Sequence, residues 1–255
     1  MKIPRAVLTG MPDVAILAGE QPVKNDPDYA AAKAGNAVAA GRLVDRFISP
    51  QAIAQVKVLV GNAQPILLPV HALEVTGINE IPIALAQRLA SELDLEADLS
   101  VIQDNTVGHT GANGYQRLAN PALFSGSVTA QANYLIVDDF IGQGGTVANL
   151  KGFVEASGGC VIGVTTLTGR PYSAKLAPEP SLIQAVRDKH GNDLENWWQQ
   201  EFGYGFDRLT QSEARYLERS PDADTIRKRV VEAGQGAGVP AAERSPQGSI
   251  INRNS

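Results

Sequence analysis

Short apolar runs alternate with amphipathic stretches along the middle of this 255-residue chain. Four of these runs are rich in apolar and β-branched residues and are bounded by polar or glycine-rich breaks, which is typical of buried strands. The runs are Pro65–Val70, Leu99–Gln103, Tyr134–Asp138 and Val161–Leu167. Continuous apolar runs that alternate with helices indicate a parallel sheet covered on both faces. We therefore expect an α/β fold with a three-layer, Rossmann-like parallel sheet.

Two helices are expected before and within this alternating region. Apolar residues repeat every three or four positions from Ile78 to Leu93. This spacing predicts a helix, with Asn79 as its N-cap and Pro82 in its first turn, where a missing N–H is tolerated. The alanine-rich residues 28–48 have a similar spacing and predict a single earlier helix.

Beyond about residue 180 the chain becomes charged and helical. Thr210 and Glu213 have the spacing of a capping box, which predicts the start of a helix. Ser220 followed by Pro221 fits an N-cap and a first-turn proline, and Gly234 would end that helix.

These changes of character predict four parts of the chain. A helical N-terminal region, residues 1–62, precedes the α/β core, residues 63–175. A helical extension follows over residues 176–234, so that the core carries helical additions at both ends. Residues 235–255 are rich in glycine, proline and polar side chains, and we expect them to be disordered.

Composition narrows the class of protein. Hydrophobic residues make up 44% of the chain, enough for a sizeable core, yet no apolar run approaches the length of a membrane span. The single cysteine, Cys160, excludes an internal disulfide and a cysteine-cluster zinc site. The first residues lack the apolar stretch of a secretory signal, so we expect a cytoplasmic protein without a membrane partner. A net charge of −5 argues against non-specific nucleic-acid binding.

The candidate chemistry lies after the third apolar run. Asp138 and Asp139 end the run, and a glycine-rich turn follows before a helix that begins near Gly145 or Thr146. Ligands of open α/β sheets bind at the carboxyl ends of the strands, and the N–H groups of such a turn bind phosphate together with the helix dipole. Carboxylates accept hydrogen bonds from sugar hydroxyls. The combination predicts a site for a phosphorylated sugar.

Other glycine-rich loops fit less well. A Walker A loop needs a lysine where Gly145 precedes Thr146, and a dinucleotide fingerprint needs a small residue where Val147 stands. A response-regulator acidic pair normally lies on an early strand. Two alternatives stay open: a structural turn beside a solvated acidic pair, and an unrelated nucleotide-binding α/β protein.

The segment Tyr134–Leu150, YLIVDDFIGQGGTVANL, resembles the 5-phosphoribosyl-1-pyrophosphate (PRPP) motif of type I phosphoribosyltransferases. The resemblance implies that Asp138 and Asp139 contact the ribose hydroxyls. It implies that the loop binds the 5′-phosphate through Gly142, Gln143, Gly144, Gly145 and Thr146. The family usually has hydroxyl-bearing or small residues at the first two loop positions. At those positions this chain keeps backbone donors but has no side-chain hydroxyl.

A second resemblance extends from about Pro65 to Thr168. The segments Leu68–His71, Gly77–Asn79 and Arg117–Asn120 are similar to the ComF branch of that superfamily, without its zinc element. The resemblance implies a pyrophosphate loop of His71, Ala72, Leu73, Glu74, Thr76 and Gly77. It also implies a hood loop over residues 104–126 that closes on the site, with Arg117 contacting pyrophosphate as a catalytic cation. A surface-loop arginine remains the alternative for Arg117.

The resemblance implies a reaction and a cofactor. A phosphoribosyltransferase transfers the 5-phosphoribosyl group to a small-molecule, usually nitrogenous, acceptor and releases pyrophosphate. Mg²⁺ would neutralise the leaving group, and Asp138 and Asp139 would hold it indirectly, through ribose hydroxyls or water. A homodimer is the family expectation. A non-catalytic PRPP- or nucleotide-sensing protein, of a regulatory or DNA-uptake type, stays open. His71, His109 and His190 lack ligand spacing, which argues against zinc.

Overall fold

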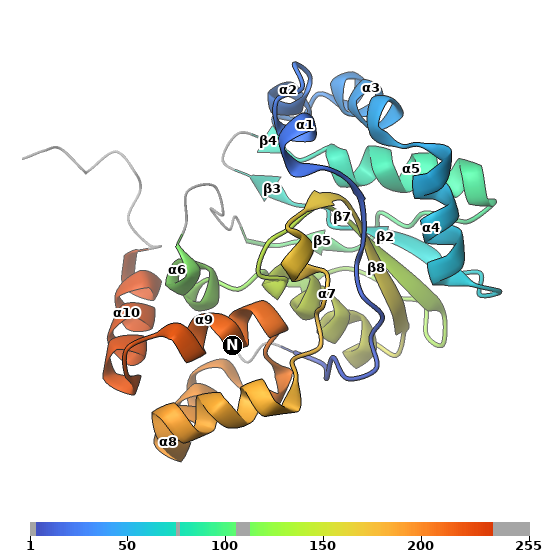
Figure 1. Cartoon of the computed structure of the whole chain (residues 1–255). Helices are drawn as coiled ribbons and strands as arrows, with labels where there is room; N and C mark the ends of the chain where they lie inside the picture. Colours follow the sequence, from blue (N-terminus) through green and yellow to red (C-terminus); the bar gives the residue numbers. More distant parts are fainter. Residues whose placement is uncertain (1–3, 75–76, 106–112, 237–255) are drawn as a thin grey trace, which may run out of the picture.

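The computed structural model of the chain describes residues 4–74, 77–105 and 113–236. Its centre is a four-stranded parallel sheet in the order β1-β8-β7-β2 (Figure 1). The strands are β1 (Ala15–Ala18), β2 (Ile66–Pro69), β7 (Asn133–Ile141) and β8 (Cys160–Gly169). The predicted α/β class with a parallel sheet is confirmed.

Helices cover both faces of this sheet. One face carries α3 (Ala37–Phe47), α4 (Pro50–Val60) and α5 (Ile81–Leu93), and the other carries α7 (Gly145–Ala156). Because successive strand residues point to opposite faces, Leu135 and Val137 pack with the first group of helices, whereas Ile136 packs with α7. The strands are buried on both sides, as their continuous apolar runs predict.

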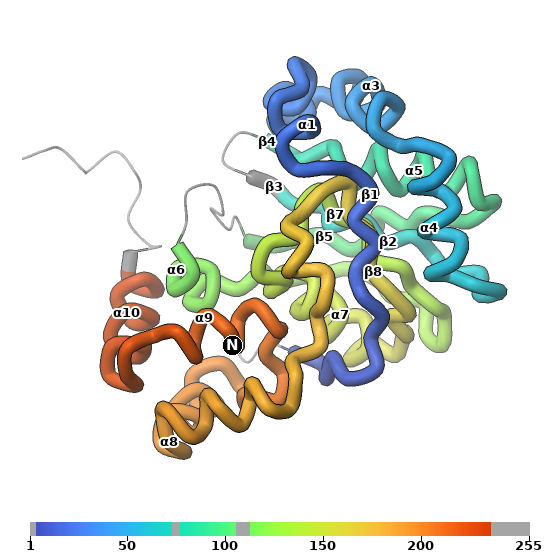
Figure 2. The backbone as a smooth tube through the Cα atoms, in the orientation of Figure 1, coloured from blue at the N-terminus to red at the C-terminus, as the bar shows by residue number. Residues whose placement is uncertain are grey.

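One predicted strand is wrongly placed, and one strand was not predicted. The run Leu99–Gln103 is not a strand of the four-stranded sheet: β5 (Ile102–Gln103) pairs with β6 (Phe124–Ser125) in an antiparallel ribbon, and one isolated parallel bridge joins Gln103 to Ala72 after β2. An apolar run does not specify its partner, and Ile102 is 43% exposed. Conversely, β1 lies in the region expected to be helical and runs beside β8 (Figure 2). A second short ribbon joins β3 (Leu73–Glu74) to β4 (Gly77–Ile78).

The single helix predicted over residues 28–48 is also wrong. The chain forms α1 (Glu20–Lys24), then α2 (Tyr29–Lys33), and turns before α3. Gly35 adopts a φ of +99°, and the Asn36 side chain caps α3 by accepting from Ala39 N. A glycine and an N-capping asparagine therefore interrupt the periodic pattern.

The start of α5 differs by one residue from the prediction. Glu80 occupies the N-cap position and makes no capping bond, while Asn79 Oδ1 accepts from Ile81 N at 3.3 Å. Pro82 lies in the first turn as predicted.

The C-terminal helices form a second hydrophobic cluster around the buried Trp198. They are α8 (Pro180–Phe202), α9 (Gln211–Arg219) and α10 (Ala223–Gly236), joined by α6 (Gly114–Ala119) from the predicted hood loop (Figure 1). The short 3-10 helices Pro171–Ser173 and Phe206–Arg208 flank α8. No described helix is both long enough and apolar enough to span a bilayer.

The predicted caps of these helices have mixed outcomes. The capping box of Thr210 and Glu213 is confirmed. Ser220 is not the N-cap of α10; it ends α9 and donates to Tyr216 O, while the Asp222 side chain accepts from Thr225 N. The helix α10 also continues past Gly234. The four-part division stays a prediction, and residues 237–255 lie outside the described residues.

Candidate functional site

The acidic pair and the glycine-rich turn lie together at the carboxyl edge of the sheet. Asp138 and Asp139 belong to β7, and α7 begins at Gly145. Gly144 is the N-cap with a φ of +80°, a left-handed conformation that glycine adopts without steric cost. The first N–H groups of a helix have no intrahelical partner and carry the positive end of its dipole. The turn therefore presents donors beside two carboxylates.

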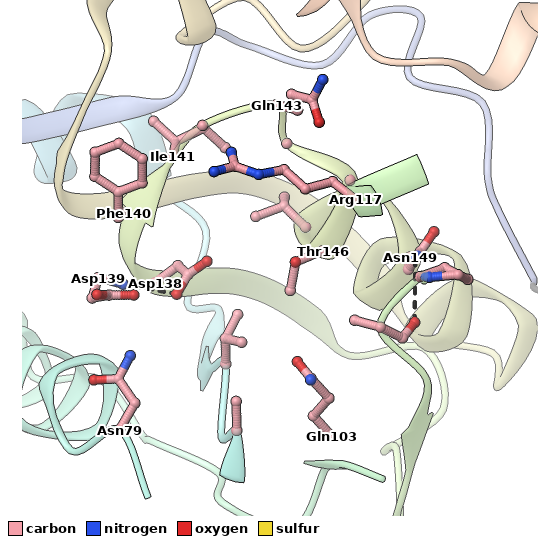
Figure 3. A pocket seen from close by; sticks show the side chains of 18 of the residues that line it. Asn79, Gln103, Arg117, Asp138, Asp139, Phe140, Ile141, Gln143, Thr146 and Asn149 are labelled. Carbon is pink, nitrogen blue, oxygen red and sulfur yellow. Dashed lines mark hydrogen bonds between the residues drawn. The ribbon is translucent and has the colours of Figure 1, made fainter. Parts of the chain in front are cut away.

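These elements line a cavity of about 560 Å³, which we call the main cavity. It brings together most of the predicted site residues: Asp138, Asp139, Gly142, Gln143, Gly144, Gly145, Thr146, Ala72 and Arg117. Figure 3 shows Arg117 reaching toward the loop, across the cavity from Asn79 and Gln103.

The predicted pyrophosphate loop is only partly in this cavity. Ala72 lines it, whereas His71 and Gly77 are not among its described lining residues. Thr76 and the side chains of Leu73 and Glu74 lie outside the described residues, as does His109. The roles proposed for this segment stay predictions.

The two aspartates have different surroundings, although each is 7% exposed. Asp138 Oδ1 accepts from Asp139 N at 2.8 Å, and Asp139 Oδ2 accepts from Lys33 Nζ at 2.9 Å. Burial, followed by the charge of Asp139, raises the pKa of Asp138 well above its usual value. Two carboxylates this close do not ionise independently. The lysine compensates the charge of Asp139, so a proton on the pair is favoured at Asp138.

Two lysines in the main cavity were not predicted. Lys24 and Lys33 come from the ends of α1 and α2, and Lys24 Nζ lies 4.1 Å from the centre of the Phe140 ring. Lys33 was missed because a continuous helix was expected over residues 28–48, whereas a break at Gly35 and Asn36 separates α2 from α3. The glycine and the capping asparagine were the available signals.

Three amide side chains in the main cavity were also not assigned to it. They are Asn79, Gln103 and Asn149. Gln103 Nε2 donates to Asn105 O at 2.6 Å, and Asn149 Nδ2 donates to Ala122 O at 3.2 Å, the dashed bond of Figure 3. Asn149 is a buried polar residue among mostly apolar buried residues of α7, which was the signal for its site position.

The glycine-rich turn is held from outside the sheet. Thr210 Oγ1 donates to Gln143 O at 2.5 Å, and Arg5 Nη2 donates to Gly145 O at 3.2 Å. Arg5 also forms a buried, two-bond ion pair with Glu213, with N–O distances of 2.8 and 2.9 Å. A Cβ atom on Gly145 would lie 2.7 Å from Glu213 Oε1. A residue near the N-terminus and residues at the start of α9 thus hold the turn in place.

Arg117 packs on the start of the turn. Its Nη1 atom would lie 3.1 Å from a Cβ atom on Gly142, so the missing side chain makes room for the guanidinium. Burial and the nearby charge of Arg170 lower the pKa of Arg117. The predicted role at pyrophosphate stays a prediction.

Asp138 and Asp139 are the residues of the main cavity that could bind a hard cation such as Mg²⁺. Among the described residues, no three His, Cys, Asp or Glu side chains are grouped so as to hold a metal ion. Two carboxylates are oxygen ligands of the kind Mg²⁺ prefers, and Mg²⁺ usually keeps several waters and substrate phosphates as ligands. The residues therefore fit indirect magnesium binding.

The fold and site together define an α/β protein with a buried acidic pair and a glycine-rich helix start at one sheet edge. No protein-family model matches the chain. It is 41% identical over 209 residues to Protein TraN of Escherichia coli, covering 82% of this chain and 47% of that protein. It is 41% identical over 128 residues to an uncharacterized protein of Haemophilus influenzae, covering 50% of this chain and 29% of that protein. The chain thus spans less than half the length of both relatives.

Three solved structures of adenine phosphoribosyltransferases are similar in part. The enzyme of Thermoanaerobacter pseudethanolicus is 18% identical with a TM-score of 0.33, covering 52% of this chain and 70% of that one. A second is 16% identical with a TM-score of 0.33, covering 51% and 76%. The Leishmania donovani enzyme is 14% identical with a TM-score of 0.32, covering 51% and 57%. TM-scores this low do not identify a substrate.

Proposed function

We propose that the main cavity binds PRPP and that the chain is a phosphoribosyltransferase of the type I superfamily, similar to its ComF branch. One observation carries the proposal: a buried acidic pair lies near the carboxyl end of β7, and the glycine-rich start of α7 follows within the same cavity of about 560 Å³. The resemblance of Tyr134–Leu150 to the PRPP motif supports it.

The glycine-rich turn and the acidic pair would bind different parts of PRPP. The N–H groups at the start of α7, with the loop Gly142–Thr146, hold the 5′-phosphate. Asp138 and Asp139 hold the ribose hydroxyls. Because its raised pKa favours a proton on Asp138, that carboxyl can donate to one hydroxyl while Asp139 accepts from the other.

The pyrophosphate of PRPP requires positive charge. Lys24 and Lys33 supply two ammonium groups in the main cavity, and Arg117 supplies a guanidinium from α6. We place the pyrophosphate toward Ala72, with the segment His71–Gly77 as its loop. Mg²⁺, held by Asp138 and Asp139 through ribose hydroxyls or water, would neutralise charge on the leaving group.

The reaction is displacement at C1 of the ribose. The bond from C1 to the acceptor nitrogen forms, and the bond from C1 to the pyrophosphate oxygen breaks with its electron pair on that oxygen. The nitrogen then loses its proton to a carboxylate of the pair or to water. The protein contributes positioning, charge stabilisation and exclusion of water by the hood, and needs no covalent intermediate. A cytoplasmic homodimer belongs to this proposal.

A second candidate is a PRPP- or nucleotide-sensing protein that uses the same site without turnover. Two observations favour it. The first two turn residues, Gly142 and Gln143, carry no hydroxyl, and the ion pair between Lys33 and Asp139 occupies one carboxylate oxygen that ribose would use.

Calorimetric titration with PRPP, with and without Mg²⁺, tests the shared claim. We expect binding by the unmodified protein, loss of binding in the double variant Asp138→Asn/Asp139→Asn, and no change in Asp193→Asn, an exposed control on α8. No heat from the unmodified protein, or undiminished binding by the double variant, refutes the site. Pyrophosphate release with a panel of nitrogenous bases then separates the enzyme from the sensor.

A further inference from the structure

A second cavity of about 270 Å³ adjoins the main cavity at the glycine-rich turn, and we call it the side cavity. The two cavities share Arg117, Gly142 and Gln143. The side cavity is otherwise lined by residues that follow β8 and by residues of α6 and α9. A ligand in it would therefore lie directly beside the phosphate turn.

The lining of the side cavity is cationic. Arg117 and Arg170 both line it, and none of its described lining residues is acidic. The two charges repel each other, which contributes to the lowered pKa of Arg117. Among the described residues, the carboxylate of Glu20 acts electrostatically on Arg170, and it is not part of the lining. Two like charges facing one small space are stabilised when an anion lies between them.

Arg170 is held by an aromatic neighbour, and a second aromatic side chain lies in the same lining. Arg170 Nη1 donates to the Tyr172 hydroxyl at 2.7 Å, and Tyr172 is 54% exposed. Tyr216, on α9, also lines the side cavity and packs edge-on against Tyr115, with ring centres 4.9 Å apart. Tyrosine rings offer flat apolar surface next to the guanidinium groups. The lining thus combines two cations with two aromatic faces.

The size of the side cavity limits what it can hold. It is smaller than the usual range of about 300–1,000 Å³ for drug-sized ligands, so it suits a single ring. A carboxylate is flat and pairs with a guanidinium through two parallel hydrogen bonds. Ser212 adds one hydroxyl to the lining.

We propose that the side cavity binds a planar ring that carries a carboxylate, with the carboxylate at Arg117 and Arg170 and the ring against Tyr172 and Tyr216. The proposal that the ring binds does not depend on PRPP binding. Its role as the acceptor of the phosphoribosyl group rests on the proposed function, and names the acceptor as an aromatic or heteroaromatic acid with a nucleophilic nitrogen.

Benzoate and benzamide are matched probes, since they share shape and differ in charge. We expect benzoate to bind the full chain in ligand-observed NMR titrations, and benzamide to bind roughly tenfold more weakly or worse, because hydrogen bonds to charged groups are the stronger ones. Arg170→Gln should weaken benzoate roughly tenfold and leave benzamide unchanged. Tyr172→Leu should weaken both. Arg219→Gln, at an exposed position of α9, is the control.

Phenyl phosphate provides the test of the anionic group. Tighter binding of phenyl phosphate than of benzoate would overturn the carboxylate assignment. Equal binding of benzoate and benzamide, or no effect of Arg170→Gln, would overturn the site.

Titration with PRPP in the same samples separates this inference from the proposed function. PRPP binding without benzoate binding refutes the side cavity and leaves the PRPP site intact. Benzoate binding without PRPP binding supports the side cavity and refutes its role as an acceptor site.

Discussion

Lys33 Nζ lies 2.9 Å from Oδ2 of Asp139, so α2 is joined to the end of β7 by residues 106 positions apart. The pair is largely shielded from water, with exposed side-chain fractions of 21% for the lysine and 9% for the aspartate. An N-terminal helix thereby reaches the acidic pair at the centre of the candidate site.

Replacing the lysine should destabilise the fold. Lys33→Gln leaves Asp139 without its cation, and we expect the free energy of unfolding to fall by about 1–3 kcal/mol in urea titrations. Lys175→Gln removes an exposed pair with Glu179 and should cost less than about 0.5 kcal/mol. Equal losses in the two variants would contradict a structural role for the Lys33 pair.

Adding one methyl group to the turn should disturb it. In Gly145→Ala the new Cβ atom would lie 2.7 Å from Glu213 Oε1, an atom held by Arg5. We expect a loss of stability of about 1–3 kcal/mol and weaker PRPP binding, as for overpacking of a filled site. The matched control is Gly234→Ala in α10, where nothing lies within 4 Å and stability should hold or rise slightly. Thermal unfolding that is identical in both variants would refute the close approach.

The buried pair of Arg5 and Glu213 should behave as a unit. Arg5→Met alone leaves a carboxylate buried without its cation, and we expect a loss of about 3–5 kcal/mol. The double variant Arg5→Met/Glu213→Leu removes both charges and should recover part of that loss. A double-mutant cycle in urea measures the coupling. Strictly additive losses would show that the two side chains do not interact.

The raised pKa of Asp138 predicts a pH dependence of stability. A carboxyl group whose pKa is raised by folding favours the native state below its unfolded pKa, for which the reference value is 3.8, and loses that contribution as pH rises through the folded pKa. Asp138→Asn does not titrate there, so its stability relative to the unmodified protein should increase as the pH is raised from about 4 through neutrality. Urea titrations across that range measure the difference.

The control for the pH series is Asp193→Asn, because Asp193 is exposed on α8. Its difference from the unmodified protein should stay constant over the same range. A constant difference for Asp138→Asn as well would mean that the carboxyl titrates alike in the folded and unfolded chain.

Local sequence patterns predicted the central strands of the parallel sheet and failed for the edge strand β1 and the N-terminal helices. Three apolar runs became β2, β7 and β8, and the capping box at Thr210 starts α9 as predicted. The single helix predicted over residues 28–48 is wrong, because the apolar residues keep a helical spacing across the turn at Gly35. The strand β1 has only four residues, too few for a recognisable pattern, and it is a strand because it pairs with β8.

The α/β class and the contiguous segment of Asp138, Asp139 and the glycine turn could be predicted from local patterns in the chain. Burial periodicity and a strand–turn–helix boundary are both local properties. The contacts of Lys33 and of the pair of Arg5 and Glu213 with that segment appear in the folded structure and were not predicted. Such contacts join residues far apart in the chain. They depend on how helices and strands pack around shared apolar surfaces, which no local pattern encodes.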